Sequence, residues 1–365
     1  MARQFDRKLI LEDGSEYYGY SFGANCERVV EVVFDTSMAG YQEIVSDPAY
    51  ANQGVVMTYP IIGSYGIGEE ENEERAPSIG ALIVAEYNDE PSNFLCKETL
   101  AQKLERCSIP GMYGADTRKL TRSIRDFGCR KGLITSAETS LEEGLRKIAN
   151  AETVKNVVAT VSAKTKREYC VKNARFKIAA IDCGINADVI RLLNASGANV
   201  AVFPYDVTAE EIEKYAADGL FISDGPGDPQ DAACVVKTVK ALKGKLPMLG
   251  VGLGHQIIAL AYGAKTYKLK FGHRGCNHSV KRLSNGKVEI VAQNHGYAVD
   301  AQSAEEVGLT VTQVNLLDGS VESICNENDK AIGVQYRLDG SAKVRASGNP
   351  LGAFLKNVQQ RKAEK

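Results

Sequence analysis

The sequence predicts a two-domain α/β protein, with a mixed α/β first half and a second half built on a mostly parallel sheet flanked by helices. The 365-residue chain, 44% hydrophobic, is long enough for two domains of ordinary size. Short β-rich runs and helical periods are mixed over the expected first domain, residues 1–150, whereas strands and helices alternate over residues 176–263 of the expected second domain, residues 176–365. The stretch 151–175 is polar and basic with weak periodicity, so we expect it to be the linker.

In the first domain the apolar patterns are short. KLILEDG (8–14) and YYGYSFG (17–23) predict the two strands of a hairpin and its turn. Two further β-rich runs are VVEVVFDTS (29–37) and GALIVAEY (80–87), and helical periods occur in residues 93–109 and 139–150. The acidic run GIGEEENEERAPS (66–78) is expected to be a solvated surface loop.

In the second domain each strand is followed by a helix. Thr208 with Glu211 three residues on predicts a capping box at one helix start. Strands alternating with helices at this spacing form parallel sheets, whose ligands bind beyond the carboxyl ends of the strands. SDGPGDP (223–229) and GVGLGHQ (250–256) both lie at such ends and should be neighbours. The expected strands are 176–184, 198–206, 220–227 and 246–251, and the expected helices are 186–197, 208–219, 231–244 and one starting near Gly254.

Composition excludes several function classes. The formal net charge is −2, and 44 basic residues nearly match 46 acidic ones, so neither nucleic acid nor a membrane surface is an expected partner. The nine cysteines are scattered without a CxxC pair, as expected for reduced thiols rather than for disulfides or a zinc site. The N-terminus has no apolar signal-like run and no apolar stretch reaches 18 residues, so we expect a cytoplasmic protein. No sequence pattern indicates a metal or a cofactor.

The stretch PMLGVGLGHQIIALAYG (247–263) has the layout of a nucleophile elbow, with a strand end, a tight glycine turn and an apolar helix. Such a turn exposes its central residue and aims backbone N–H groups at a developing oxyanion, as acyl transfer requires. Here the central residue is Gly252, which has no side chain. On spacing alone, close packing of the strand against the helix explains the glycines equally well.

The wider sequence resembles a known family. SDGPGDP, residues 250–280 and QNHGYAVD (293–300) resemble the class I glutamine amidotransferase domain of the carbamoyl-phosphate synthetase small subunit. Residues 31–53, 57–66 and 114–128 resemble the N-terminal domain of the same subunit. The resemblance covers nearly the whole chain and implies that a large synthetase subunit is the partner. That family hydrolyses glutamine and passes ammonia to the large subunit, which makes carbamoyl phosphate from bicarbonate and ATP.

The catalytic positions depart from the family pattern. The family reads G-[IV]-C-L-G-H-Q at the elbow and H-P-E later, whereas this chain has Gly252 for the Cys and Arg337, Leu338 and Asp339 for His, Pro and Glu. Glycine cannot form a thioester, and arginine stays protonated and cannot act as a general base. Glycine also avoids the strain of an elbow residue, a gain on the order of 1 kcal/mol. We therefore predict that no catalytic triad is intact.

The glutamine pocket is expected to be partly kept. The family's D-P-S-Y loop supplies a hydroxyl, but here DPAY places Ala49 at that position, and Tyr297 replaces the usual Phe. The other positions that the resemblance implies for glutamine binding are Gly225, Gly227, Leu253, Gln256, Asn294 and Gly296.

None of the other candidates fills the vacancy. The four histidines, His255, His273, His278 and His295, all belong to other parts of the motifs, and His255 on the elbow helix is expected to be structural. The cysteines nearest the motifs are Cys183 and Cys276, and we expect both to be buried inert thiols because neither stands at an elbow.

Three functions remain open at this point. The favoured one is a non-hydrolysing small subunit that supports ammonia-dependent carbamoyl phosphate synthesis, in a pyrimidine or an arginine pathway. The second is a binding or sensing module for glutamine or a small carboxylate held by Arg337, although Arg337 facing solvent or pairing with Asp339 explains the same residue. The third is an unconventional amidotransferase in which Asp339 activates a water.

Overall fold

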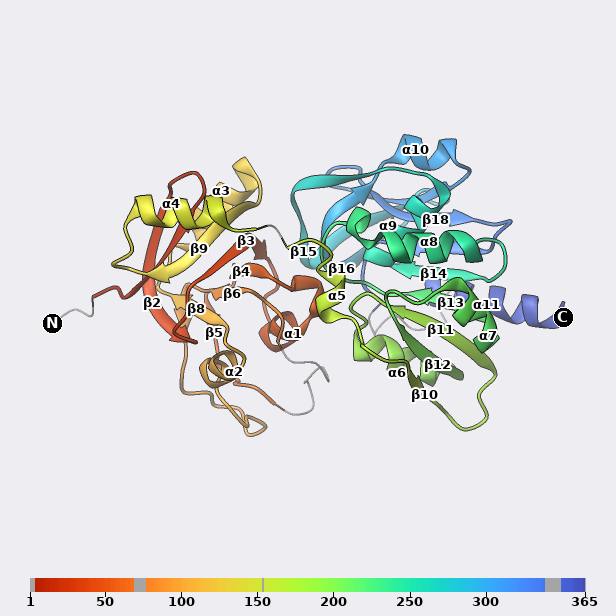
Figure 1. The fold of residues 1–365 in the computed structure, drawn as a ribbon, viewed down its shortest axis with the longest axis horizontal. Helices are drawn as coiled ribbons and strands as arrows, with labels where there is room; N and C mark the ends of the chain where they lie inside the picture. Colours follow the sequence, from red (N-terminus) through yellow and green to blue (C-terminus); the bar gives the residue numbers. More distant parts are fainter. Residues whose placement is uncertain (1–3, 69–76, 153, 339–348, 365) are drawn as a thin grey trace. The chain divides into compact units, whose positions relative to one another are not determined.

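The structure is a computed structural model that describes residues 4–68, 77–152, 154–338 and 349–364. The chain divides into two compact units, Met1–Val154 and Lys155–Lys365 (Figure 1). The expected linker is not a bare connection, because residues 155–175 contain a short helix, α5 (Val158–Val161), and a strand, β10 (Arg167–Tyr169), that pairs with a strand of the second unit.

The first unit is built on a closed barrel, which the sequence patterns did not predict. The expected hairpin is present as β1 and β2, and the β-rich run at residues 29–37 is present as β3. In barrel order the strands are β1 (Arg7–Leu11), β2 (Glu16–Gly23), β8 (Pro110–Tyr113), β6 (Ala81–Ile83), β4 (Gln53–Met57), β3 (Arg28–Asp35) and β9 (Arg130–Ser136).

Short helices and one small sheet surround the barrel (Figure 1). Only the second half of residues 93–109 is helical, because the capping box of Thr99 and Gln102 starts the helix there. Residues 69–76 of the expected acidic loop lie outside the described residues. The helices are α1 (Tyr41–Ser46), η1 (Pro48–Tyr50), α2 (Leu100–Arg106), α3 (Thr117–Phe127) and α4 (Leu141–Asn150), and β5 (Ile61–Ile62) pairs with β7 (Glu86–Tyr87).

The second unit contains a sheet whose described part has ten strands, in the order β10-β12-β11-β13-β14-β19-β18-β17-β15-β16. Its parallel strands are the predicted ones together with β19. An antiparallel extension, which the alternating pattern did not reveal, continues the sheet beyond β19. The bounds are β11 (Phe176–Asp182), β12 (Ala198–Pro204), β13 (Gly219–Ile222), β14 (Met248–Val251), β15 (Thr266–Arg282), β16 (Val288–Val299), β17 (Thr310–Asn315), β18 (Val321–Asn326) and β19 (Ala331–Val334).

Helices cover both faces of this sheet and bury two apolar clusters (Figure 1). One cluster holds Ile212, Val235 and Ile257 from three helices, and the other holds Leu193 and Phe354 from helices on the opposite face. None of the helices in the described ranges combines the length and apolar character of a transmembrane span. The helices are α6 (Ala187–Ala195), α7 (Ala209–Tyr215), η2 (Pro229–Ala232), α8 (Ala233–Leu242), α9 (Leu253–Tyr262), α10 (Ala301–Glu306) and α11 (Pro350–Ala363).

Candidate functional site

The predicted elbow is present at the end of β14. Gly252 has φ 54° and ψ −112°, a conformation that side chains rarely adopt, and α9 starts at the next residue. The Gly252 N–H donates to the Val334 carbonyl at 2.9 Å, and the Gly252 carbonyl accepts from the Gln256 N–H at 3.3 Å. The backbone at this turn therefore has the geometry of a nucleophile elbow, and residue 252 contributes no side chain to it.

Asp224 occupies the anion-binding side of this turn, and sequence reasoning missed it. One oxygen, Oδ1, accepts from the Gly225 N–H at 2.8 Å and from the Leu253 N–H at 2.9 Å. In elbow enzymes the N–H after the nucleophile and a second N–H from a neighbouring loop form the oxyanion hole. Both donors of that kind are thus bound to one carboxylate of the chain itself. An acidic residue directly before the GPG turn was the available sequence signal.

The electrostatics of Asp224 reflect two opposing effects. Burial raises its pKa to about 6, while the hydrogen bonds from the Leu253 and Gly225 N–H groups act in the opposite direction. At pH 7 the side chain is therefore mainly an ionised carboxylate in the position that suits an oxyanion.

Gly252 and Asp224 also share space. A Cβ atom built on Gly252 would overlap the carboxylate of Asp224 and would lie 2.8 Å from its Oδ2. The absence of a side chain at residue 252 and the inward carboxylate at residue 224 are therefore complementary features of one turn.

Arg337 follows the neighbouring strand. Val251 of β14 pairs with Val334 of β19, so Gly252 and Arg337 both lie beyond the carboxyl ends of adjacent parallel strands. The Arg337 N–H donates to the Ala292 carbonyl at 3.0 Å, and Leu338 is buried in the apolar core. Asp339 lies outside the described residues. The structure thus confirms that the GPG and elbow motifs are neighbours and adds Arg337 to the same edge of the sheet.

The residues expected to bind glutamine lie on three elements of the second unit and one of the first. Leu253 and Gln256 begin α9, Gly225 and Gly227 follow β13, and Asn294, Gly296 and Tyr297 lie on β16. The Gln256 amide is buried and donates to the Tyr297 carbonyl at 2.8 Å and to Gln335 Oε1 at 3.0 Å, so it joins α9 to β16. Ala49 is buried in η1, where its N–H donates to Asp47 Oδ1 at 3.0 Å.

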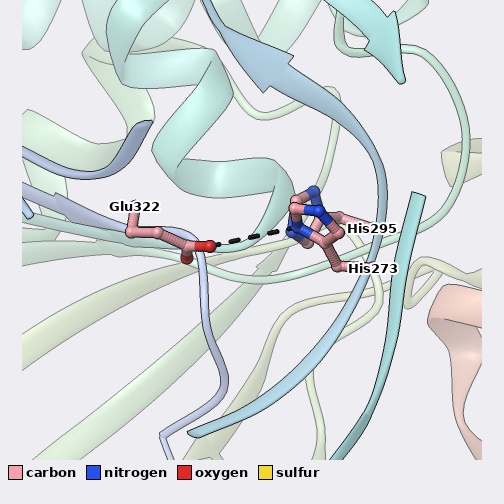
Figure 2. A group of neighbouring side chains, drawn as sticks. All are labelled: His273, His295 and Glu322. Atoms are coloured by element: carbon pink, nitrogen blue, oxygen red, sulfur yellow. Dashed lines mark ion pairs between the residues drawn. The ribbon is translucent and has the colours of Figure 1, made fainter. Parts of the chain in front are cut away.

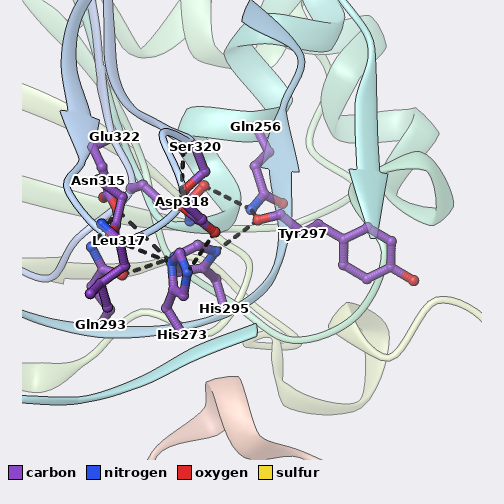
Figure 3. Close-up of polar contacts among 11 residues, drawn as sticks. Gln256, His273, Gln293, His295, Tyr297, Asn315, Leu317, Asp318, Ser320 and Glu322 are labelled. Carbon is purple, nitrogen blue, oxygen red and sulfur yellow. Dashed lines mark hydrogen bonds and ion pairs between the residues drawn. The ribbon is translucent and has the colours of Figure 1, made fainter. Parts of the chain in front are cut away.

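A second polar cluster supports β16 from the antiparallel part of the sheet. Figure 2 shows His273 of β15, His295 of β16 and Glu322 of β18, whose side chains meet in the interior with polar atoms within 4.8 Å of one another. His273 Nε2 lies 3.1 Å from Asp318 Oδ2, and His295 Nδ1 lies 2.8 Å from the Tyr297 carbonyl (Figure 3). The sequence analysis assigned both histidines to family motifs but did not predict that they form a cluster with Glu322.

Two histidines and a glutamate are ligand types that suit zinc. In this structure, however, Glu322 Oε1 already accepts from Gln293 Nε2 at 2.6 Å and from Asn315 Nδ2 at 2.8 Å. Burial lowers the pKa of His295 well below its ordinary value, with a further contribution from His273, and burial raises the pKa of Glu322. The cluster is thus a hydrogen-bond network, and its contact with the Tyr297 carbonyl, which Gln256 shares, fixes this part of β16.

Burial distinguishes the remaining candidate residues, one histidine and two cysteines. His255 is fully buried near Gly333, and burial lowers its pKa to about 3, so it packs as a neutral ring. Cys183 is buried and burial raises its pKa, as expected for an inert thiol. The same expectation is wrong for Cys276, which is exposed because it lies on an outward-facing part of β15. None of the nine cysteines, all of which lie in the described ranges, forms a disulfide.

Comparison with known proteins agrees with this geometry. The family model "Carbamoyl-phosphate synthase small chain, CPSase domain" matches residues 9–134, and "Glutamine amidotransferase class-I" matches residues 179–343. A "Carbamoyl phosphate synthase small chain" from Fusobacterium nucleatum is 41% identical over 97% of this chain and 98% of its own length. One of the same name from Bacillus cereus is 43% identical over 98% of this chain and 97% of its own length. The chain therefore belongs to the family of carbamoyl phosphate synthase small chains.

Proposed function

We propose that this chain is a non-hydrolysing small subunit, which binds a carbamoyl phosphate synthase large subunit and supports synthesis from free ammonia. The observation that carries the proposal is Gly252 at the centre of a complete elbow. Hydrolysis of an unactivated amide needs a nucleophile, a group that takes its proton and a donor to the leaving nitrogen. Gly252 provides no nucleophile, and the guanidinium of Arg337 takes up no proton.

Retention of the scaffold supports the docking part of the proposal. Both family domains are present at about 40% identity over nearly the whole chain. The strands, the elbow backbone and the Gln256 bridge to β16 are in place, while the resemblance assigns Gly252 and Arg337 to the positions of the family's Cys and His. A subunit that has lost its own reaction but still stabilises a partner would keep these features.

A sensing role through Arg337 receives less support. The two N–H groups that would receive an external carboxylate at the elbow are already bound to Asp224. A small acid would therefore have to displace an internal carboxylate before reaching them, which lowers the free energy available for binding.

The test is reconstitution with a bacterial carbamoyl phosphate synthase large subunit. The purified complex is supplied with bicarbonate, ATP and either ammonium chloride or glutamine, and both carbamoyl phosphate and released glutamate are measured. We expect synthesis with ammonium and only background product and glutamate with glutamine. Glutamate release above that of the large subunit alone would refute the loss of hydrolysis, and failure to copurify would refute docking.

A further inference from the structure

The turn at the end of β14 combines an empty nucleophile position with an occupied oxyanion position. The Asp224 carboxylate accepts hydrogen bonds from the Gly225 and Leu253 N–H groups. It also occupies the space that a side chain at residue 252 would need. These are separate geometric facts, because one concerns the hydrogen bonds of Oδ1 and the other concerns the space beside the Gly252 Cα.

We infer that Asp224 is the resident ligand of this turn, so that the pocket blocks itself against the amide carbonyl of glutamine. The inference deepens the proposed function and rests on it, because a blocked oxyanion position is compatible only with a subunit that does not hydrolyse glutamine. It adds a residue, Asp224, to the determinants of the lost reaction and names the chemical class that the turn binds, a carboxylate.

Asp224 is held on this turn by its neighbours. It follows β13, which pairs with β14 in register Ile222 with Gly250, so the loop after β13 lies beside the elbow. The adjacent Ser223 hydroxyl accepts from the Cys183 N–H at 2.9 Å, which anchors the loop to the strand on its other side. The carboxylate is thus placed by the sheet and does not depend on a flexible surface contact.

Two consequences follow from this placement. If the carboxylate is removed, the two N–H groups face an empty space that a small free carboxylate fits. If a Cβ is added to residue 252, the carboxylate must leave its donors. The cost of a side chain at residue 252 therefore depends on the side chain at residue 224, and double substitutions measure that coupling.

The first experiment measures formate binding to the isolated full chain by thermal melting and calorimetry. Asp224→Ala opens the turn, and the shape-matched Asp224→Asn, which keeps an oxygen at the donors, is the control. We expect sodium formate to raise the Tm of Asp224→Ala above the value in sodium chloride of equal concentration, with no such difference for the unaltered chain or Asp224→Asn. Equal responses of all three proteins, or no response of Asp224→Ala, would overturn the inference.

The second experiment introduces Gly252→Ala with and without Asp224→Ala. The strain of a side chain at φ 54° is common to both backgrounds and cancels in the cycle. We expect Gly252→Ala to lower the Tm more when Asp224 is present, with a difference between the two shifts of at least about 2–4 °C for a unit of this size. Equal shifts would show that Asp224 does not fill this space.

A crystal structure of the unaltered chain grown in formate checks the same point without any substitution. We expect the Asp224 carboxylate, and no formate, on the Gly225 and Leu253 N–H groups, and the opposite arrangement would overturn the inference. None of these readouts involves a large subunit or glutamine turnover. A failure here therefore leaves the loss of hydrolysis standing, while glutamate release by the complex would refute that loss separately.

Discussion

Two regions of the second unit are held together in different ways. At the carboxyl ends of β13, β14 and β19, the backbone has the geometry of a nucleophile elbow, Gly252 contributes no side chain and Arg337 contributes a guanidinium. In the antiparallel extension, the network around Glu322 keeps its polar side chains bonded to one another. The elbow is fixed by backbone hydrogen bonds and packing, so its side chains can change without loss of the fold. The network consists of side-chain hydrogen bonds, so substitution of one of its members should lower the stability of the fold.

Repair of the elbow should give the largest effect. We expect Gly252→Cys with Arg337→His, Asp339→Glu and Ala49→Ser to restore glutamine hydrolysis, because the turn that presents the nucleophile is already formed. The rate with a large subunit should exceed that of the unaltered chain by at least about 10²-fold, as measured by glutamate release, and Asp224→Ala should raise it further. Gly252→Cys alone should stay at background. Restoration by that single change would show that the remaining machinery is not degenerate.

The sequence was sufficient for the elbow and the parallel strands, because both depend on local periodicity and on glycine at the turn. It was insufficient for Asp224, whose contact with the Leu253 N–H arises from the pairing of β13, which ends at Ile222, with β14, which begins only at Met248. The network around His273 was also hidden, because β15 and β16 pair with register shifts that local patterns do not show. The barrel of the first unit was missed for a similar reason, since β6 has only three residues and pairs in parallel with distant strands.

Truncation of the network should give the next largest effect. Glu322→Ala removes the acceptor of the Gln293 and Asn315 amides and leaves two buried donors unsatisfied, at a cost of about 1–3 kcal/mol each. We expect the Tm to fall by roughly 2–4 °C for each kcal/mol.

The matched control is Glu322→Gln, which keeps an acceptor oxygen and removes the charge. Because burial raises the pKa of Glu322, ionisation at neutral pH opposes folding, and the Gln variant should melt at or above the temperature of the unaltered chain at pH 8. Equal losses in both variants would mean that the charge, and not the acceptor, stabilises this region.

The contribution of Asp224 to the pH dependence of the Tm should be a smaller effect, and its sign follows from the direction of the pKa shift. The pKa of Asp224 is raised from its ordinary value near 3.8 to about 6, so the folded state binds its proton more tightly than the unfolded state does. This contribution is fully present below about pH 4 and is lost as pH rises through about 6. We therefore expect the Tm of Asp224→Asn relative to the unaltered chain to increase from pH 4 to about pH 7, one unit above this pKa, and then to remain constant.

Scanning calorimetry between pH 4 and pH 8 would measure this difference. Glu322→Gln, measured in parallel, separates the contribution of the network from that of the elbow. A difference that decreases with pH would mean that hydrogen bonding to the two N–H groups outweighs burial.

Thiol labelling should distinguish the two regions without changing stability. Cys183 follows β11 and is fully buried beside the loop after β13, where its N–H donates to the Ser223 hydroxyl, and burial raises the pKa of its thiol, so both its access and its thiolate fraction are low. Cys276 lies on β15 only three residues from the buried His273, yet it is exposed. Brief treatment of the folded chain with iodoacetamide, followed by peptide mass spectrometry, should label Cys276 and leave Cys183 unmodified until denaturant is added. Labelling of Cys183 at the rate of Cys276 would mean that the loop carrying Ser223 and Asp224 opens readily, which would contradict the fixed placement of the Asp224 carboxylate.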